Sequence, residues 1–149
     1  MTSILSLTHL SGVEQLRLAF QGEENAAPIA RTLHYALTEI EEGRALFVGT
    51  PDFTVYNPIG SVHGGYIATL LDSAMSCAVQ TTIPAGSGYT TVEIKVNFVR
   101  AVTDKTGPVR AEGRIISAGK RIGTSEGRLT DGQGRLLAHG TATCLIFPL

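Results

Sequence analysis

The residue of this chain best suited to chemistry is a carboxylate inside an apolar segment. Residues 57–78 read NPIGSVHGGYIATLLDSAMSCA, and Asp72 is the one acidic side chain among them. An ionised carboxylate packed against a core costs several kcal/mol unless it is paired or solvated. Asp72 is therefore either a reactive group or half of a structural pair that caps a loop or meets an arginine across an interface.

Two glycines precede this carboxylate at a place where they could bind an anion. His63, Gly64 and Gly65 open the segment that carries Asp72. Paired glycines bring bare backbone N–H groups close to a ligand, at the positive end of a helix. Backbone donors together with a carboxylate suggest acyl-transfer chemistry.

The residues after the glycines have the spacing of one core-facing helix stripe. The apolar positions are Ile67, Leu70, Leu71, Ala74, Met75 and Ala78. Before this helix, the sequence predicts a short amphipathic helix over residues 11–21, a linker over 22–28, and two strands over 35–40 and 44–49.

After the central helix the sequence predicts only strands, joined by turns. Residues 91–100 alternate, with Val92, Ile94, Val96 and Phe98 on one face, and further strands are predicted over 109–117, 122–129 and 136–147. Consecutive strands need only hairpin connections, which favours an antiparallel α+β sheet over a parallel nucleotide-binding one. No glycine-rich phosphate-binding pattern opens a helix.

Composition excludes several classes of protein. The 149 residues suit one domain, and 12 basic against 13 acidic residues give a net charge of −1, with no electrostatic footprint for nucleic acid. No apolar run reaches membrane-spanning length, and the first residues lack the pattern of a secretion signal, so we expect a cytoplasmic protein. Cys77 and Cys144 have no partners at metal-ligand spacing, so we expect buried thiols and no metal, with a nucleophilic Cys77 as the minor alternative.

The motifs together resemble a known family. The Asn-Pro-x-Gly turn, the HGG with Asp72 nine residues after His63, the LLDSAM helix, the TTVEIKVNF strand and the LLAHGTATC strand resemble the hotdog-fold acyl-CoA thioesterases, and most closely the phenylacetate-degradation (PaaI-like) group. The resemblance implies one hotdog domain over residues 1–149, in which an antiparallel sheet wraps around one long helix. Residues 1–32 would be an N-terminal helix and linker, and residues 33–149 the hotdog core.

The resemblance also implies roles for individual residues. Asp72 resembles the catalytic carboxylate, either a general base or a nucleophile, and the Gly64 N–H resembles the oxyanion donor. Asn57 resembles the amide that orients water or the thioester, and His63 the residue that shapes the loop. Either of these two could instead be a turn or loop anchor.

Further residues are candidates for binding the substrate. They are Gly65, Ser76 and Thr91 near the thioester, and Lys120 and Arg121 for the coenzyme A phosphates. Simple alternation places Thr91 on the polar face of its strand, so its role requires a bulge or a strand end there. Coenzyme A belongs to the substrate, and no other cofactor is expected.

The spacing between Gly64 and Asp72 predicts that each active site takes residues from two chains. A rise of about 1.5 Å per residue puts Gly64 and Asp72 roughly 12 Å apart along a helix. A base and an oxyanion donor must both lie within about 3 Å of the same reacting group. We therefore expect an obligate homodimer with composite active sites, assembled further into a homotetramer.

The leading functional hypothesis is hydrolysis of an aryl-acyl or medium-chain acyl-CoA to the free acid and coenzyme A. One alternative is a non-catalytic hotdog protein that binds acyl-CoA and would not need Asp72. A second alternative is a hotdog hydratase or dehydratase, whose His-Phe-Pro-Gly motif differs from the HGG of this chain.

Overall fold

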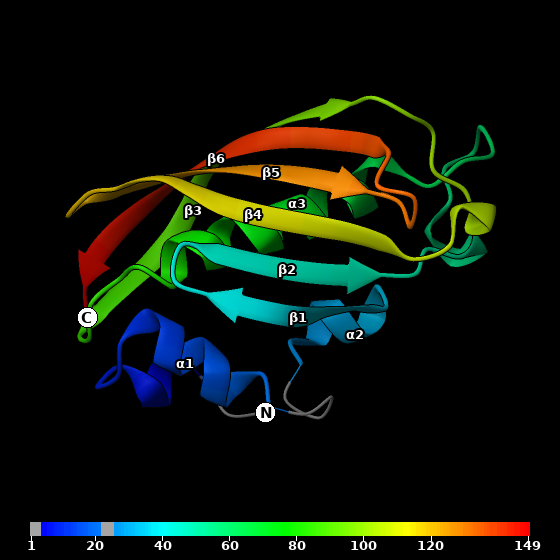
Figure 1. Cartoon of the computed structure of the whole chain (residues 1–149). Coiled ribbons are helices and arrows are strands. Elements are labelled where there is room, and N and C mark those ends of the chain that lie inside the picture. Colours follow the sequence, from blue (N-terminus) through cyan, green and yellow to red (C-terminus); the bar gives the residue numbers. More distant parts are fainter. Residues whose placement is uncertain (1–3, 22–25) are drawn as a thin grey trace.

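One antiparallel sheet and one long helix make up most of the computed structural model, which describes residues 4–21 and 26–149. The strands are β1 (Tyr35–Glu41), β2 (Arg44–Gly49), β3 (Ser87–Phe98), β4 (Val109–Ala118), β5 (Ile122–Thr130) and β6 (Leu136–Pro148). They pair in the order β1-β2-β4-β5-β6-β3. The helices are α1 (Gly12–Ala19), α2 (Pro28–Thr32) and α3 (Gly64–Gln80). Figure 1 shows the sheet curving around α3, so the predicted α+β hotdog architecture is confirmed.

The linker predicted over residues 22–28 is only partly described. Residues 22–25 lie outside the described residues, and Pro28 is the first residue of α2, a helix that the sequence pattern did not indicate. Proline suits this first helical position because its missing N–H has no partner there in any case.

The apolar stripe of α3 forms the centre of the core. The six positions that the sequence placed on this stripe are at most 4% exposed. The helix also approaches the sheet closely, because a methyl group at Gly113 of β4 would lie 2.1 Å from the carbonyl oxygen of Ala74. Burial of this stripe fixes the rotation of α3 and leaves Asp72 on its open side.

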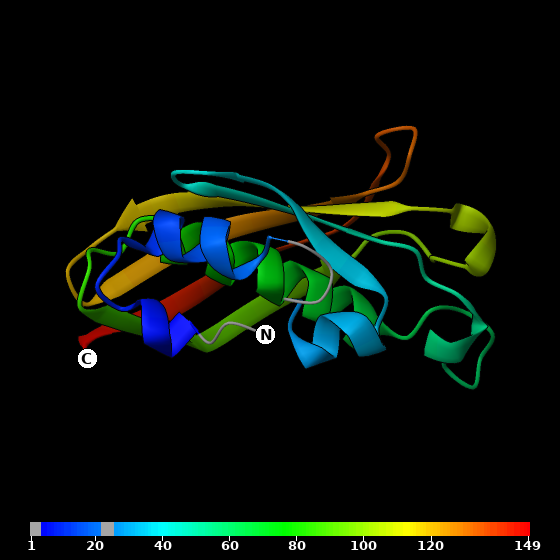
Figure 2. The same ribbon diagram turned by 90° about the horizontal axis from the view of Figure 1, so that it is seen from below.

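A buried polar chain attaches α1 to the C-terminal end of α3. The Gly12 N–H donates to the carbonyl of Ile83 over 3.0 Å. The Gln80 amide donates to Gln15 over 3.3 Å and accepts from the Tyr89 hydroxyl over 3.1 Å, and both glutamines are at most 1% exposed. Each buried amide thus has a partner, and Figure 2 shows α1 lying alongside α3.

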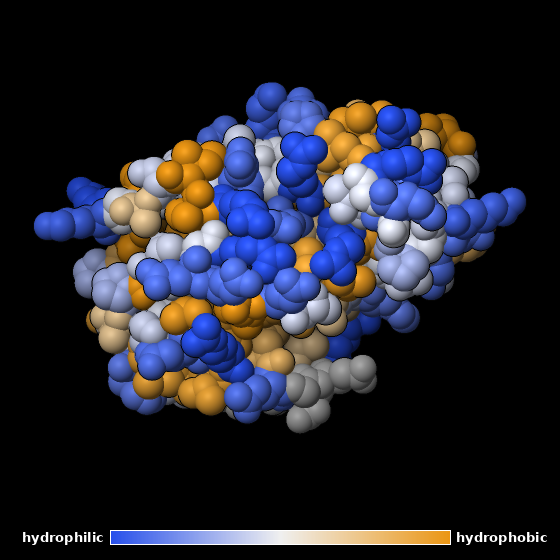
Figure 3. Space-filling model, viewed as in Figure 1, coloured by the Kyte–Doolittle hydropathy of each residue, from blue (hydrophilic) through white to orange (hydrophobic). Residues whose placement is uncertain are grey.

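The outer face of the sheet is charged. Arg44 on β2 forms ion pairs with Glu39 and Glu41 of the β1 region and with Glu112 of β4. Figure 3 views this face, and hydrophilic side chains cross its middle. None of the helices within the described residues is long and apolar enough to cross a membrane.

Strand β3 lies at the edge of the sheet and exposes apolar side chains. Ile94 and Phe98 face the helix side but are 39% and 58% exposed. Val92, which the alternation places on the same face, is unpaired where the register shifts between Thr91 and Glu93, and it is 57% exposed. The irregularity turns Thr91 toward the helix.

Candidate active site

Asp72 is half-buried on the open side of α3 and makes one hydrogen bond. The Thr91 hydroxyl on β3 donates to Oδ1 of Asp72 over 3.1 Å. Within residues 4–21 and 26–149, no cation pairs with this carboxylate and Thr91 is its one hydrogen-bond partner. A single donor leaves Oδ2 available to water or substrate.

The Thr91 contact depends on the bulge in β3. The sequence pattern alone places Thr91 with Glu93 and Lys95 on the outer face, but the register shift after Thr91 brings its hydroxyl inward. The thiol of Cys144 lies 3.9 Å from the same hydroxyl. Thr91 therefore links the carboxylate to the buried part of the sheet.

The buried thiols near Asp72 are protonated at neutral pH. Burial, reinforced by the negative charge of Asp72, raises the pKa of Cys77 to about 12. Burial likewise raises the pKa of Cys144. A thiol with so high a pKa is a poor nucleophile, which disfavours the reading of Cys77 as the reactive group.

The N-terminus of α3 presents one free backbone donor. His63 is the N-cap, and its Nδ1 accepts from the Gly65 N–H over 2.8 Å, so the neutral ring carries its proton on Nε2. Gly65 is thus capped rather than bare. Among the described residues the Gly64 N–H has no acceptor, and it lies at the positive end of the helix.

The aromatic ring of Phe98, a residue of β3, lies next to Gly64. A Cβ at Gly64 would lie 3.0 Å from Cζ of Phe98, so the glycine leaves room for the ring. The alternation of β3 indicated only that Phe98 belongs to an apolar face, and the contact with the helix start was not predictable from it.

Within one chain, the side chain of Asn57 forms hydrogen bonds with residues of its own loop. Its Oδ1 accepts from the N–H groups of Ile59 and Ser61, over 3.1 and 3.2 Å, and its Nδ2 donates to the Ser61 hydroxyl over 3.1 Å. These bonds shape the turn that precedes α3. A role in orienting water stays a prediction.

The remaining predicted residues do not meet Asp72 within one chain. Ser76 donates to the carbonyl of Ser73 over 3.4 Å rather than to the carboxylate. Lys120 and Arg121 are exposed in the turn between β4 and β5. This turn lies toward the C-terminal end of α3, since a Cβ at the nearby Gly123 would approach Val79 to 2.5 Å.

Another hydroxyl pair near Asp72 has no sequence signal. The hydroxyls of Tyr35 on β1 and Ser73 on α3 lie 3.1 Å apart, although 38 positions separate them in the chain. Ser73 is the residue next to Asp72, so the β1 edge of the sheet reaches the open side of α3.

Comparison with known proteins identifies the chain's relatives. A protein of Saccharolobus solfataricus described as a candidate esterase is 35% identical over 88 residues, which cover 59% of this chain and 57% of that protein. Matches to the curated relatives span about half of their length. The structure of a conserved protein from Pseudomonas aeruginosa has a TM-score of 0.76 and 26% identity over 82% of this chain and 95% of that one.

The fold is also that of a phenylacetic acid degradation protein. The E. coli PaaI protein from that operon has a TM-score of 0.78 and 20% identity, with 91% of this chain and 94% of that chain covered. A sequence model described as the thioesterase superfamily matches residues 59–138, a stretch that contains Gly64, Asp72 and Thr91. Because this match spans more than half of the 149 residues, the chain belongs to the thioesterase superfamily.

Proposed function

We propose that this protein is a hydrolase that cleaves acyl-CoA thioesters to the free acid and coenzyme A. The observation that supports it most is the Asp72 carboxylate, half-buried without a cation partner among the described residues and held at one oxygen by Thr91. A structural carboxylate in such a place would be expected to carry an ion pair or several donors. The superfamily membership and the esterase-like relatives agree with this chemistry.

Asp72, Gly64 and Thr91 each have one role in the proposed reaction. Water attacks the thioester carbonyl carbon while Asp72 accepts its proton, and the Gly64 N–H stabilises the oxyanion that forms. Collapse of the tetrahedral intermediate breaks the C–S bond, and Asp72 returns the proton to the departing thiolate. Thr91 keeps the carboxylate in one orientation throughout.

The site takes residues from two chains in this proposal. Gly64 and Asp72 lie about 12 Å apart along α3, too far to act on one carbonyl. The edge strand β3 contacts Asp72 through Thr91 and lies next to Gly64 through Phe98. It also exposes Ile94 and Phe98, and an unpaired apolar edge is a surface that a second chain can cover. A two-fold dimer through this edge places Asp72 of one protomer near Gly64 of its partner.

The substrate class and larger assembly follow from the resemblance to PaaI-like proteins. On that basis we infer an aryl-acyl or medium-chain acyl-CoA as substrate and a homotetramer built from two such dimers. Lys120 and Arg121 are the proposed contacts for the coenzyme A phosphates, because both are exposed and, in the described part of the chain, neither pairs with an acid.

Thiol release from a panel of acyl-CoAs tests this function. Wild-type protein is compared with Asp72→Asn, after gel filtration has established that both have the same size. A fall of at least about a hundredfold in kcat/KM supports Asp72 as the catalytic carboxylate. Equal rates would remove Asp72 from the chemistry, and tight acyl-CoA binding without turnover by wild type would contradict the hydrolase.

A further inference from the structure

A cavity of about 590 Å³ lies beside β1, at the edge of the sheet opposite to β3. Its walls come from the end of α1, from α2, and from β1 and β2. Its size falls within the range of about 300–1,000 Å³ that is typical of small-molecule sites. Packing between elements leaves few voids larger than a water molecule, so this space has the size of a binding site rather than of a packing gap.

This cavity is separate from the Asp72 carboxylate. In the described part of the chain, its lining includes no residue of α3 and none of the residues assigned to the thioester. The hydroxyls of Tyr35 and Ser73 lie 3.1 Å apart, so a hydrogen-bonded tyrosine stands between the cavity and the residue next to Asp72. A ligand of the cavity is therefore not a substrate held at Asp72.

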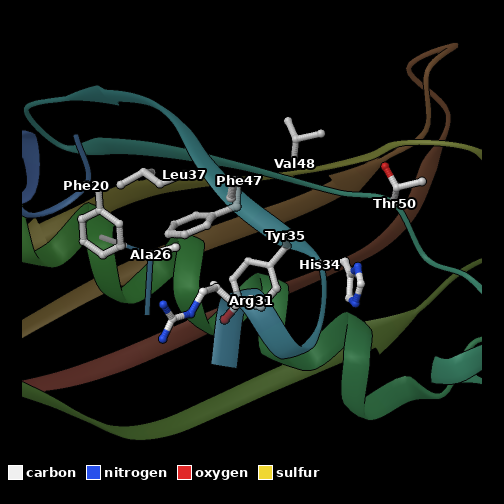
Figure 4. Close-up of a pocket in the computed structure, with 11 residues that line it drawn as sticks. Phe20, Ala26, Arg31, His34, Tyr35, Leu37, Phe47, Val48 and Thr50 are labelled. Atoms are coloured by element: carbon white, nitrogen blue, oxygen red, sulfur yellow. The ribbon is translucent and has the colours of Figure 1, made fainter. Parts of the chain in front are cut away.

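The floor of the cavity is apolar and aromatic. The buried rings of Tyr35 and Phe47 meet edge to face with their centroids 5.8 Å apart, and the half-buried Phe20 lines the same space. Figure 4 shows these three rings grouped on one side of the space, with the Arg31 side chain next to them. Such a floor favours the apolar part of a ligand.

The rim of the cavity is basic. Arg31 and His34 line it and are exposed, and no lining residue is acidic among those that the structure describes. Within residues 4–21 and 26–149, Arg31 has neither an ion pair nor a hydrogen-bond acceptor for its guanidinium. Hydrogen bonds from Thr54 lower the pKa of Asp52, and the nearby His34 adds to this effect, but Asp52 does not line the cavity. The guanidinium of Arg31 is thus available to an anion.

The backbone is strained at this rim. His34 has a φ of 55°, and it is the one non-glycine residue with a positive φ in the described ranges. This left-handed region is unfavourable for a residue with a Cβ, and such conformations are concentrated at active sites and ligand sites. His34 lies between α2 and β1, so its conformation sets where Arg31 stands relative to Tyr35.

We propose that this cavity binds a small monocarboxylate with an apolar body, and that it does so independently of the proposed hydrolysis. Arg31 holds the carboxylate at the rim through two parallel hydrogen bonds, and the His34 ring can donate another. The apolar body leaves water for the rings of Tyr35 and Phe47. Inorganic phosphate fits less well, because burial of a dianion against apolar rings is costly.

Three probes separate the two parts of the ligand. Hexanoate has both a carboxylate and an apolar chain, hexanol has the chain alone, and inorganic phosphate is an anion without a chain. Each is titrated into the whole chain while the amide NMR signals of Ala30 and Leu37, two wall residues, are followed. Hexanoate should shift both signals, hexanol should bind at least about tenfold more weakly, and phosphate should leave the signals in place.

Three variants locate the binding site. Arg31→Gln should weaken hexanoate binding at least about tenfold and leave the response to hexanol unchanged. The matched control is Arg17→Gln, at an exposed position of α1 that does not line the cavity, and it should behave as wild type with both probes. Ala26→Trp fills the space from a half-buried position outside the helices and strands, and it should abolish both responses. Thermal unfolding establishes that each variant is folded.

Several outcomes would overturn the proposal. They are the absence of a shift with hexanoate, equal affinity for hexanoate and hexanol, and equal binding by Arg31→Gln and Arg17→Gln. A response to hexanoate that survives in folded Ala26→Trp would also place the ligand elsewhere. Asp72→Asn should bind hexanoate as wild type does, and a loss of binding there would mean that the ligand sits at the candidate active site. None of these readouts requires thioester hydrolysis, so they stand even where wild type turns over no acyl-CoA.

Discussion

The hydroxyl of Thr91, on the edge strand β3, donates a 3.1 Å hydrogen bond to the carboxylate of Asp72 on the central helix. The two residues are 19 positions apart, and a break in the strand register makes the contact possible. This bond fixes one oxygen of the carboxylate and leaves the other free. The hydrogen bond therefore holds the Asp72 side chain in one orientation.

Thr91→Val should lower kcat by about tenfold without unfolding the protein, because it removes the one donor that orients Asp72 and keeps the side-chain volume. Thr91→Ser should recover most of the rate, since it restores the hydroxyl. Steady-state kinetics of thiol release measure both effects.

The matched control is Thr90→Val, an exposed position one residue earlier on the same strand. It should leave kcat within about twofold of wild type. A loss as large in Thr90→Val as in Thr91→Val would mean that the strand, and not the hydrogen bond, matters.

Removal of the hydroxyl group should change the free energy of unfolding in opposite directions at two core tyrosines, Tyr66 and Tyr35. The Tyr66 hydroxyl is buried and has no hydrogen-bond partner among the described residues, so Tyr66→Phe should raise the free energy of unfolding by about 1 kcal/mol. The Tyr35 hydroxyl pairs with Ser73, so Tyr35→Phe should lower it by about 1 kcal/mol. Urea denaturation followed by circular dichroism measures both, and destabilisation by Tyr66→Phe would reveal a partner for its hydroxyl in the assembly.

The native thiols should resist labelling at pH 8. With its pKa raised to about 12 by burial, Cys77 carries only about one thiolate in ten thousand molecules at that pH. Both cysteines should therefore react with a disulfide reagent only after denaturation. Fast labelling of one thiol in the native protein would contradict this burial.

The same thiol makes stability depend on alkaline pH. In the unfolded chain Cys77 ionises near its ordinary value of 9.0, whereas in the folded chain it stays protonated up to about pH 12. The unfolded state then binds fewer protons, so the free energy of unfolding should fall as the pH rises through this window. Cys77→Ala should weaken that dependence, which a series of urea denaturation curves can measure.

Local pattern was enough to predict the central helix and the sheet. The spacing from Ile67 to Ala78 indicated which side of α3 is buried, and that side fixes where Asp72 points. The family model and the strand order confirmed the fold that this pattern implied. Hydrophobic periodicity is a strong signal because the core enforces it at every turn.

Contacts that depend on register or on distant segments could not be predicted in the same way. A one-residue shift in β3 reverses the face of Thr91, and strict alternation contains no sign of it. The capping of Gly65 by His63 depends on a side-chain rotamer, and the pairing of Tyr35 with Ser73 on the approach of β1 to α3. Such features follow from tertiary packing rather than from local preference.

The most direct test of a composite active site is complementation between two inactive variants. Asp72→Asn removes the base. Gly64→Pro removes the oxyanion donor at the first helical position, where the backbone tolerates proline and the exposed ring of Phe98 must move aside for the added carbons. When the two proteins exchange subunits in equal amounts, half of the dimers are mixed, and each mixed dimer contains one intact site out of two. Thiol release should then return to about a quarter of the wild-type rate. Activity that stays at the level of the separate variants would contradict a site shared between two chains.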